Sequence, residues 1–164
     1  MLARASPLST IGKRESSGRV GLAAQQVGEA VQLTVVDISA VEDRPSTLRL
    51  NGEQKDPGTS MPLILINPTV ELHAGIAVGV EGCLSFPEIT ADIERAESVT
   101  ARAQTLEGEH VTIEASGLLA RALQHEVDHL NGILFIDRMN SAAKAALASR
   151  LKRLQKETQR ALKA

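Results

Sequence analysis

The segment QHEVDHLNG (124–132) constrains the fold of this chain more than any other stretch of its sequence. Apolar residues before and within it recur at helical spacing, and the Asn-Gly pair near its end is a typical C-terminal stop for a helix. On a helix, His125 and His129 lie one turn apart on the same face, close enough to meet a single cation. Glu126, one step round the helix, could reach a water beside that cation without being a ligand. The segment therefore predicts a helix that carries either a metal site or an ordinary polar patch.

The sequence before this helix reads as strands and turns. Alternating or β-rich patterns predict strands in 31–38, 62–72, 98–106 and 110–115. The region 20–28 is expected to form a tight turn, and 41–60, with two Pro, two Gly and many charges, an exposed loop. Around the helix we expect Ser116 to be the N-cap, GILFI (132–136) to form a short strand, and a second helix to begin near Ser141.

These patterns predict an α+β fold, with mostly antiparallel strands packed around a central HExxH helix and an amphipathic helix at the C-terminus. We expect a single domain over 1–164, in which 1–19 is loosely structured. Residues 141–164 carry seven Lys or Arg and one acidic residue, although the whole chain has a net charge of −2. The C-terminal helix should therefore present one basic face and one face of leucines.

Composition excludes several classes of function. The chain has two Phe and no Trp or Tyr, so stacking on nucleobases is excluded as its main mode of binding, and no sequence-specific nucleic acid partner is expected. Its single cysteine rules out an internal disulfide and fits a reducing compartment. No apolar run approaches the roughly 20 residues that span a bilayer. We expect a cytoplasmic protein, monomeric and without a membrane partner.

A third metal ligand has to come from upstream of the two histidines. No histidine follows His129, whereas EGCLSFP (81–87) contains the only cysteine, Cys83. A lone cysteine is commonly just a small buried apolar residue. Together with two histidines, however, a thiolate completes a three-ligand site that leaves a fourth tetrahedral position for water. An ordinary H-E-x-x-H protease remains an alternative, but it would leave Cys83 without a role.

Three motifs in the order GLAAQQ (21–26), EGCLSFP and QHEVDHLNG resemble the signatures of peptide deformylases, and the resemblance covers roughly residues 20–160. It implies an enzyme that removes the formyl group from the N-terminal formyl-methionine of newly made proteins and releases formate. It implies Cys83, His125 and His129 as metal ligands, with Fe²⁺ as the usual native metal and Zn²⁺, Ni²⁺ or Co²⁺ able to replace it. Glu126 would be the general acid and base, and Gln26 with the backbone N–H of Leu84 would stabilise the oxyanion.

The resemblance also implies where substrate and partners bind. Nascent formyl-methionyl peptides would bind along the glycine-containing first motif, and the basic C-terminal helix could contact the ribosome. Glu81 and Asp128 could orient the histidines, whereas Arg95 matches a family arginine without a firm role. The implied substrate-binding residues are Val20, Gly21, Phe86, Leu118 and Ala122.

Two departures from the family pattern motivate an alternative. Arg19 stands where the first motif usually has glycine, and only residues 1–18 precede it, without the helical pattern that family members carry there. Arginine would intrude on the rim of the cleft, so substrate access is where we expect this chain to differ. The alternative is a deformylase-like protein with impaired or absent catalysis that acts through ribosome or peptide binding.

Overall fold

The computed structural model describes residues 20–163, and Arg19 and the segment before it lie outside these residues. Strand order in the larger sheet is β1-β2-β5-β8-β9-β3-β4, and all its pairings are antiparallel. The seven strands are β1 (Gly21–Ala23), β2 (Leu33–Val36), β3 (Ser46–Leu50), β4 (Glu53–Lys55), β5 (Leu63–Leu72), β8 (Ser98–Gln104) and β9 (His110–Ser116). A short 3-10 helix, η2 (Ala24–Val27), follows β1.

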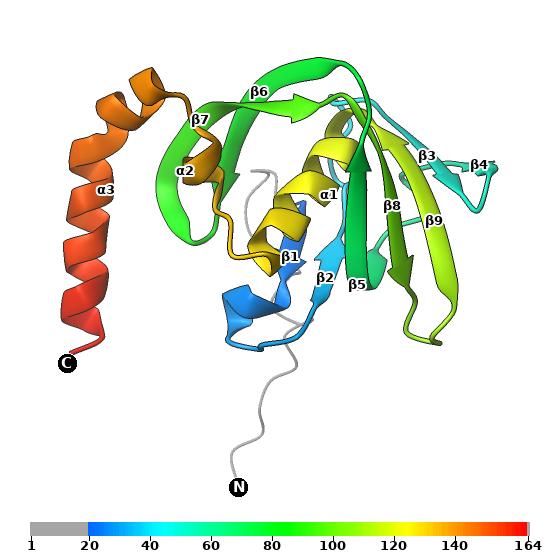
Figure 1. Ribbon diagram of the computed structural model, residues 1–164, viewed down its shortest axis with the longest axis horizontal. Helices are drawn as coiled ribbons and strands as arrows, with labels where there is room; N and C mark the ends of the chain where they lie inside the picture. Colours follow the sequence, from blue (N-terminus) through cyan, green and yellow to red (C-terminus); the bar gives the residue numbers. More distant parts are fainter. Residues whose placement is uncertain (1–19, 164) are drawn as a thin grey trace, which may run out of the picture.

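Helix α1 (Gly117–Leu130) lies in the hollow of this curved sheet, and the long hairpin of β6 (Ile76–Cys83) and β7 (Phe86–Ala96) arches over it (Figure 1). The short helix α2 (Phe135–Arg138) follows, and α3 (Ser141–Ala161) stands beside the hairpin. The expected α+β architecture is confirmed: antiparallel strands surround the helix that carries the two histidines, and an amphipathic helix ends the chain.

The core forms where the inner face of the sheet meets α1. Alternate residues of β2, β5, β8 and β9 point inward, as the period-two pattern of those segments requires. Their partners are the leucines and alanines of α1, which is buried along most of its length. The fully buried side chains with the largest volume in this core are Leu48, Leu65, Ile113, Leu119, Leu123, Val36 and Val99.

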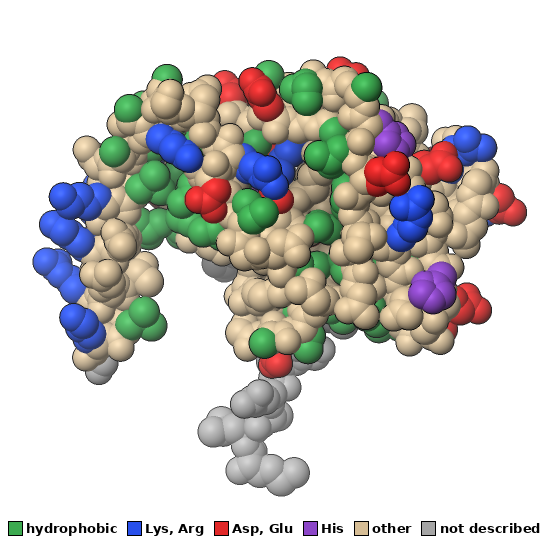
Figure 2. Space-filling model, in the orientation of Figure 1, with side chains coloured by type: hydrophobic (Ala, Val, Ile, Leu, Met, Phe, Trp, Pro, Cys, Tyr) green, Lys and Arg blue, Asp and Glu red, His purple; other side chains and the backbone are tan. Residues whose placement is uncertain are grey.

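A second apolar cluster joins α3 to the hairpin. Phe135 of α2 lies at its centre, together with Ile89 and Ile93 of β7. Helix α3 contributes one stripe, Ala143, Leu147, Leu151 and Leu154, whereas Leu162 at its end remains 82% exposed. Figure 2 shows a row of basic side chains on the opposite, outward face, whereas Arg150 and Lys144 donate to the backbone carbonyls of Glu88 and Asp137. Among the described residues, no helix is both long and apolar enough to cross a membrane.

The structure corrects four expectations. Part of the expected loop 41–60 is the β3–β4 hairpin, whose β3 pairs with β9 and buries Leu48 completely. The segment 132–136 is a turn that leads into α2, not a strand. The turn expected at 20–28 contains β1, which pairs with β2. Ser116 occupies the N-cap position of α1 but makes no capping hydrogen bond; the hydroxyl of Ser46 accepts one from the Leu119 N–H instead.

Candidate metal centre and active site

Two elements bring three metal-binding side chains together. Helix α1 presents His125 and His129 on one face, with their rings edge to face and their Nε2 atoms 3.1 Å apart. Cys83, the last residue of β6, places its Sγ 3.1 Å from His129 Nε2. The three donor atoms all lie within 4.8 Å of one another, and no other such group occurs among residues 20–163. Donors bound tetrahedrally at 2.0–2.3 Å lie about 3.3–3.6 Å apart, so this spacing fits one transition-metal ion.

The orientation of His125 is set by a buried carboxylate. Glu81 of β6 places Oε2 2.9 Å from His125 Nδ1, which leaves Nε2 directed at Cys83 and His129. Glu81 is itself held by Arg95 of β7, whose Nε and Nη2 donate to its two oxygens at 2.9 and 3.0 Å. Burial raises the pKa of Glu81, but its contacts with His125 and Arg95 outweigh burial and lower it to about 2. Glu81 is therefore ionised wherever the protein is folded near neutral pH.

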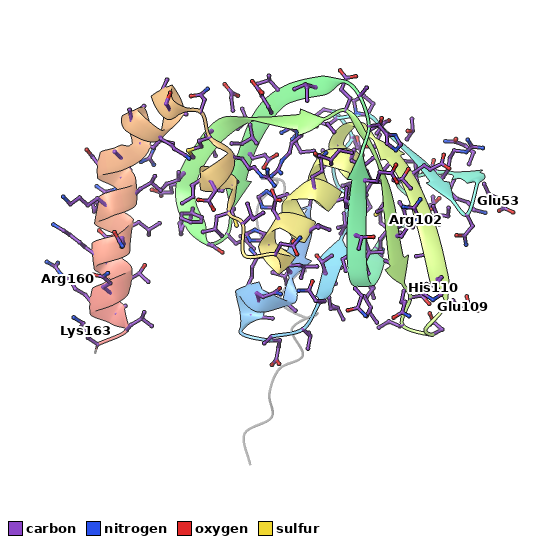
Figure 3. All side chains as sticks on the ribbon, in the orientation of Figure 1. Glu53, Arg102, Glu109, His110, Arg160 and Lys163 are labelled. Atoms are coloured by element: carbon purple, nitrogen blue, oxygen red, sulfur yellow. The ribbon has the colours of Figure 1, made fainter. Side chains whose placement is uncertain are left out.

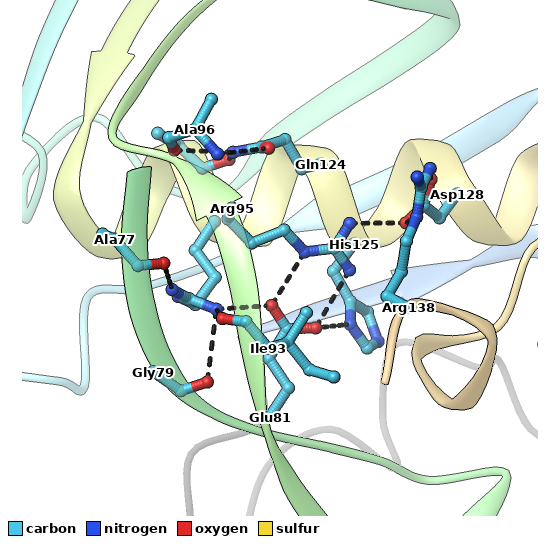
Figure 4. Close-up of polar contacts among 12 residues, drawn as sticks. Ala77, Gly79, Glu81, Ile93, Arg95, Ala96, Gln124, His125, Asp128 and Arg138 are labelled. Carbon is cyan, nitrogen blue, oxygen red and sulfur yellow. Dashed lines mark hydrogen bonds and ion pairs between the residues drawn. The ribbon is translucent and has the colours of Figure 1, made fainter. Parts of the chain in front are cut away.

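The same network ties the hairpin to the helix (Figure 4). Arg121 of α1 donates to Glu81 Oε1 at 2.8 Å and to the backbone carbonyls of Ala77 and Ile93. Asp128, one turn beyond His125 on α1, accepts hydrogen bonds from Arg95 and Arg138. Cys83 on the hairpin and the histidines on the helix thus belong to two elements held together by buried ion pairs.

Arg121 and Arg138 were missed by sequence reasoning. Arg121 lies in the apolar run that predicted the buried face of α1, and it is only 7% exposed. A buried arginine needs carboxylate or carbonyl partners, so its place among leucines was a usable signal. The sequence did not indicate which carboxylate or carbonyl groups would pair with Arg121. Arg138, at the end of α2, carried no signal of this kind.

Glu126 lies against the first motif. The residue is only 3% exposed, and the Thr34 Oγ1 of β2 lies 3.3 Å from Glu126 Oε2. Gly21 of β1 packs directly on it: a Cβ at this position would lie 2.3 Å from Glu126 Oε1. Burial raises the pKa of this carboxyl from 4.5 to about 7, although the charges of His125 and His129 oppose the rise. A carboxyl with a pKa near 7 can both take and return a proton at neutral pH.

Cys83 and His125 form a pair suited to a cation. Burial raises the pKa of the Cys83 thiol, but hydrogen bonds with His125 and His129 outweigh it and lower the pKa from 9.0 to about 5. Burial lowers the pKa of His125, but Cys83 and Glu81 outweigh it and raise the pKa from 6.5 to about 9. Cys83 is thus a thiolate near neutral pH, and its surroundings stabilise a positive charge next to it. A divalent metal would supply that charge as the His125 proton leaves.

Gln26 is the polar side chain of the first motif that reaches this group. Its Nε2 donates to Cys83 Sγ at 3.4 Å, and its Oε1 accepts from the Ala23 N–H at 2.9 Å, which fixes the orientation of the amide. Leu84, whose backbone N–H is the second expected oxyanion donor, directly follows Cys83. A cavity of about 380 Å³ opens beside Gln26 and His129, with Ser85 on its wall.

The five expected substrate-binding residues do not share one surface. Val20 and Gly21 lie at β1, and Ala122 is buried in the main core. Leu118 lines a second cavity of about 460 Å³, next to Gly79 and Arg121. Phe86 packs edge to face on Phe135, 5.6 Å between ring centroids, within the cluster that holds α3.

Comparison with known proteins gives one consistent family. The sequence model described as polypeptide deformylase matches residues 9–145. The chain is 45% identical over 152 residues to a peptide deformylase of Opitutus terrae, which covers 92% of this chain and 78% of that protein. For the peptide deformylase of Methylacidiphilum infernorum the identity is 42% over 137 residues, or 84% and 72% of the two chains. The solved structure of Arabidopsis thaliana peptide deformylase 1B with an inhibitor superposes with a TM-score of 0.73 at 36% identity, covering 88% of this chain and 72% of that one.

Proposed function

This chain belongs to the peptide deformylase family, and we propose that its Cys83-His125-His129 centre removes the formyl group from N-terminal formyl-methionine of newly synthesised polypeptides, releasing formate. The observation that carries this proposal is the convergence of the three donor atoms with the Glu126 carboxyl and the Gln26 amide. A binding protein without catalysis has no physical need for all five groups, so they favour hydrolysis over that alternative.

The donor set suggests the identity of the metal. One thiolate and two imidazoles suit Fe²⁺, Zn²⁺, Ni²⁺ and Co²⁺, and we take Fe²⁺ as the native ion, as expected from the family. A metal held by these three side chains supplies Lewis-acid chemistry, polarising the formyl oxygen and lowering the pKa of water.

The residues of the chain carry the remaining steps. Glu126 accepts the proton of the attacking water and returns it to the departing amine, and the burial that raises its pKa favours this role. The Gln26 amide and the Leu84 N–H donate to the oxygen that becomes negative during attack. Because Gln26 Oε1 is fixed by the Ala23 N–H, its amide is oriented before substrate arrives. Glu81 keeps His125 turned toward the centre throughout.

The peptide is expected to lie along β1, with Val20 and Gly21 beneath its backbone. The 460 Å³ cavity next to Leu118 is one turn along α1 from Ala122 and is large enough for a methionine side chain. Of the five expected substrate-binding residues, only Leu118 lines this cavity. Nascent formylated chains are made at cytoplasmic ribosomes, so we place a monomeric enzyme there, with the basic face of α3 directed at ribosomal RNA.

Formate release from formyl-Met-Ala-Ser tests the proposal. Protein purified without oxygen and analysed for metal should release formate, and the Glu126→Ala variant should lose activity by at least about 100-fold while keeping its metal, because proton transfer contributes on that order. A folded, metal-loaded wild-type protein that releases no formate from any formyl peptide would sink the proposal. Cleavage of unformylated casein would point instead to a protease.

A further inference from the structure

A single hydroxyl lies in the buried layer between β2 and α1. Thr34 is 0% exposed, although the neighbouring inward residue of β2, Val36, is apolar and completes the main core. A hydroxyl in such a position is unfavourable unless it is hydrogen-bonded. Its Oγ1 donates to the Leu22 carbonyl at 3.0 Å and lies 3.3 Å from Glu126 Oε2. Valine has the same shape and would fill the space without a polar group.

The Glu126 carboxyl is confined from two sides by one strand pair. Pairing of β1 with β2 sets Gly21 opposite Val36 and Ala23 opposite Thr34, so Gly21 and Thr34 both face α1. The Gly21 backbone blocks any shift of Oε1 toward β1, because even a methyl group there would overlap it. Thr34 holds the other oxygen. The pair of strands β1 and β2 therefore fixes the position of the Glu126 carboxyl as well as that of Gln26.

We propose that Thr34 is a positioning residue for Glu126, an inference that rests on the proposed deformylase function. A hydroxyl has one proton to donate and can also accept. The Thr34 hydroxyl is shared between the Leu22 carbonyl and Glu126 Oε2, at 3.0 and 3.3 Å, and so anchors the carboxyl to the strand pair. The hydroxyl thus ties Oε2 to the strand pair while Gly21 confines Oε1, and a valine at position 34 could not hold Oε2 in this way.

Thr34→Val and Thr34→Ser separate this role from packing. For Thr34→Val we expect unchanged metal content, a thermal midpoint equal to or above that of wild type, a KM for formyl-Met-Ala-Ser within twofold, and a kcat about 10-fold lower, the loss that one hydrogen bond to a charged group can cause. Thr34→Ser removes only the methyl group and keeps the hydroxyl. It should recover most of the lost kcat despite poorer packing and a lower midpoint.

Equal kcat for Thr34→Val and wild type would overturn the inference, as would equal losses for the valine and serine variants. Crystal structures of wild type and Thr34→Val give a readout that does not depend on turnover. We expect the Glu126 carboxyl to leave its place against Gly21, or to occupy several positions, in the valine variant alone. An unchanged carboxyl refutes the positioning role, whereas an inactive wild type with a displaced carboxyl in the variant refutes only the proposed deformylase function.

Discussion

At the scale of single residues, the surroundings of Glu126 disfavour its ionised form. Its carboxyl is buried beside a thiolate, and its pKa is raised from 4.5 to about 7. Between these two pH values the folded protein binds more protons at this group than the unfolded chain does. The contribution of Glu126 to the stability of the metal-free protein therefore falls as the pH rises from about 4.5 to about 7, and it stays lower above that range.

Glu126→Gln removes this titration while keeping the shape of the side chain. Metal-free Glu126→Gln should be more stable than wild type at pH 8 by about 2–3 kcal/mol, and equally stable near pH 4, where both side chains are neutral. Urea unfolding of both proteins across this range measures the difference. Two parallel curves would show that the buried carboxyl is not the source of the pH dependence.

Some site residues can be predicted from residue type and spacing alone, whereas others can be recognised only from their contacts in the structure. The donors Cys83, His125 and His129 follow from residue type and spacing, and the structure brings them together. Thr34 and Arg138 could not be found this way, because a threonine in a strand and an arginine after a helix are ordinary in sequence. Only the pairing of β1 with β2 places the threonine at Glu126, and only the turn before α2 places the arginine at Asp128.

At the scale of elements, periodicity identified the strands whose inner face is apolar and failed where that face is polar. The β6 strand has its apolar residues outside: Ile76, Val78 and Val80 are 58–64% exposed, while Glu81 is buried. Its inner positions accommodate the guanidinium groups of the ion-pair network, so the usual pattern is inverted. The Asn51-Gly52 pair was a sequence signal for the β3–β4 hairpin. Both residues adopt positive φ, as a tight two-residue hairpin turn requires.

The hairpin and α1 depend on Arg95 for their relative position. This side chain bridges Glu81 and Asp128 and is 5% exposed. Arg95→Met would leave both carboxylates with fewer partners, so we expect a loss of stability of about 3–5 kcal/mol, because removing one partner strands buried charge. Metal affinity should fall as well, since Glu81, left with Arg121 as its only arginine partner, orients His125 less firmly. Urea unfolding and a cobalt titration followed by absorbance measure the two effects.

Arg102→Met is the matched control for this change. Arg102 pairs with Glu71 on the exposed surface of the larger sheet, and both side chains are more than 60% exposed (Figure 3). Exposed pairs contribute little, so this variant should stay within about 1 kcal/mol of wild type with unchanged cobalt binding. If the two variants behaved alike, the buried network would have no special role in joining the hairpin to the helix.

At the scale of the whole molecule, the catalytic residues and the excess of basic charge lie on different elements, and α3 carries the charge. Its leucine stripe packs on the hairpin cluster, far from the strands of the larger sheet (Figure 1). A row of its basic side chains faces away from the body (Figure 2), whereas Lys144 and Arg150 donate to the backbone carbonyls of Asp137 and Glu88. Arg160 and Lys163 lie near its free end, as Figure 3 shows. Residues 1–140 carry a net negative charge, so a polyanionic partner would be attracted to this helix more than to the body of the protein.

Charge removal on α3 tests the proposed contact with the ribosome. Lys156, Arg160 and Lys163 are exposed and lie outside the leucine stripe, so replacing all three by Gln should leave folding and formate release unchanged. Co-sedimentation with ribosomes at low salt should weaken, and the dependence of binding on salt should become shallower because fewer phosphate contacts remain.

The matched control removes three charges from the opposite side of the molecule. Arg49, Lys55 and Arg102 are exposed on the larger sheet, so replacing them by Gln gives the same net charge as the α3 variant. If ribosome binding depends on a contact through α3, only the helix variant loses co-sedimentation. If both variants lose it equally, the attraction reflects net charge and α3 is no docking element. If neither loses it, the basic face is simply the solvated side of a helix that packs on its own domain.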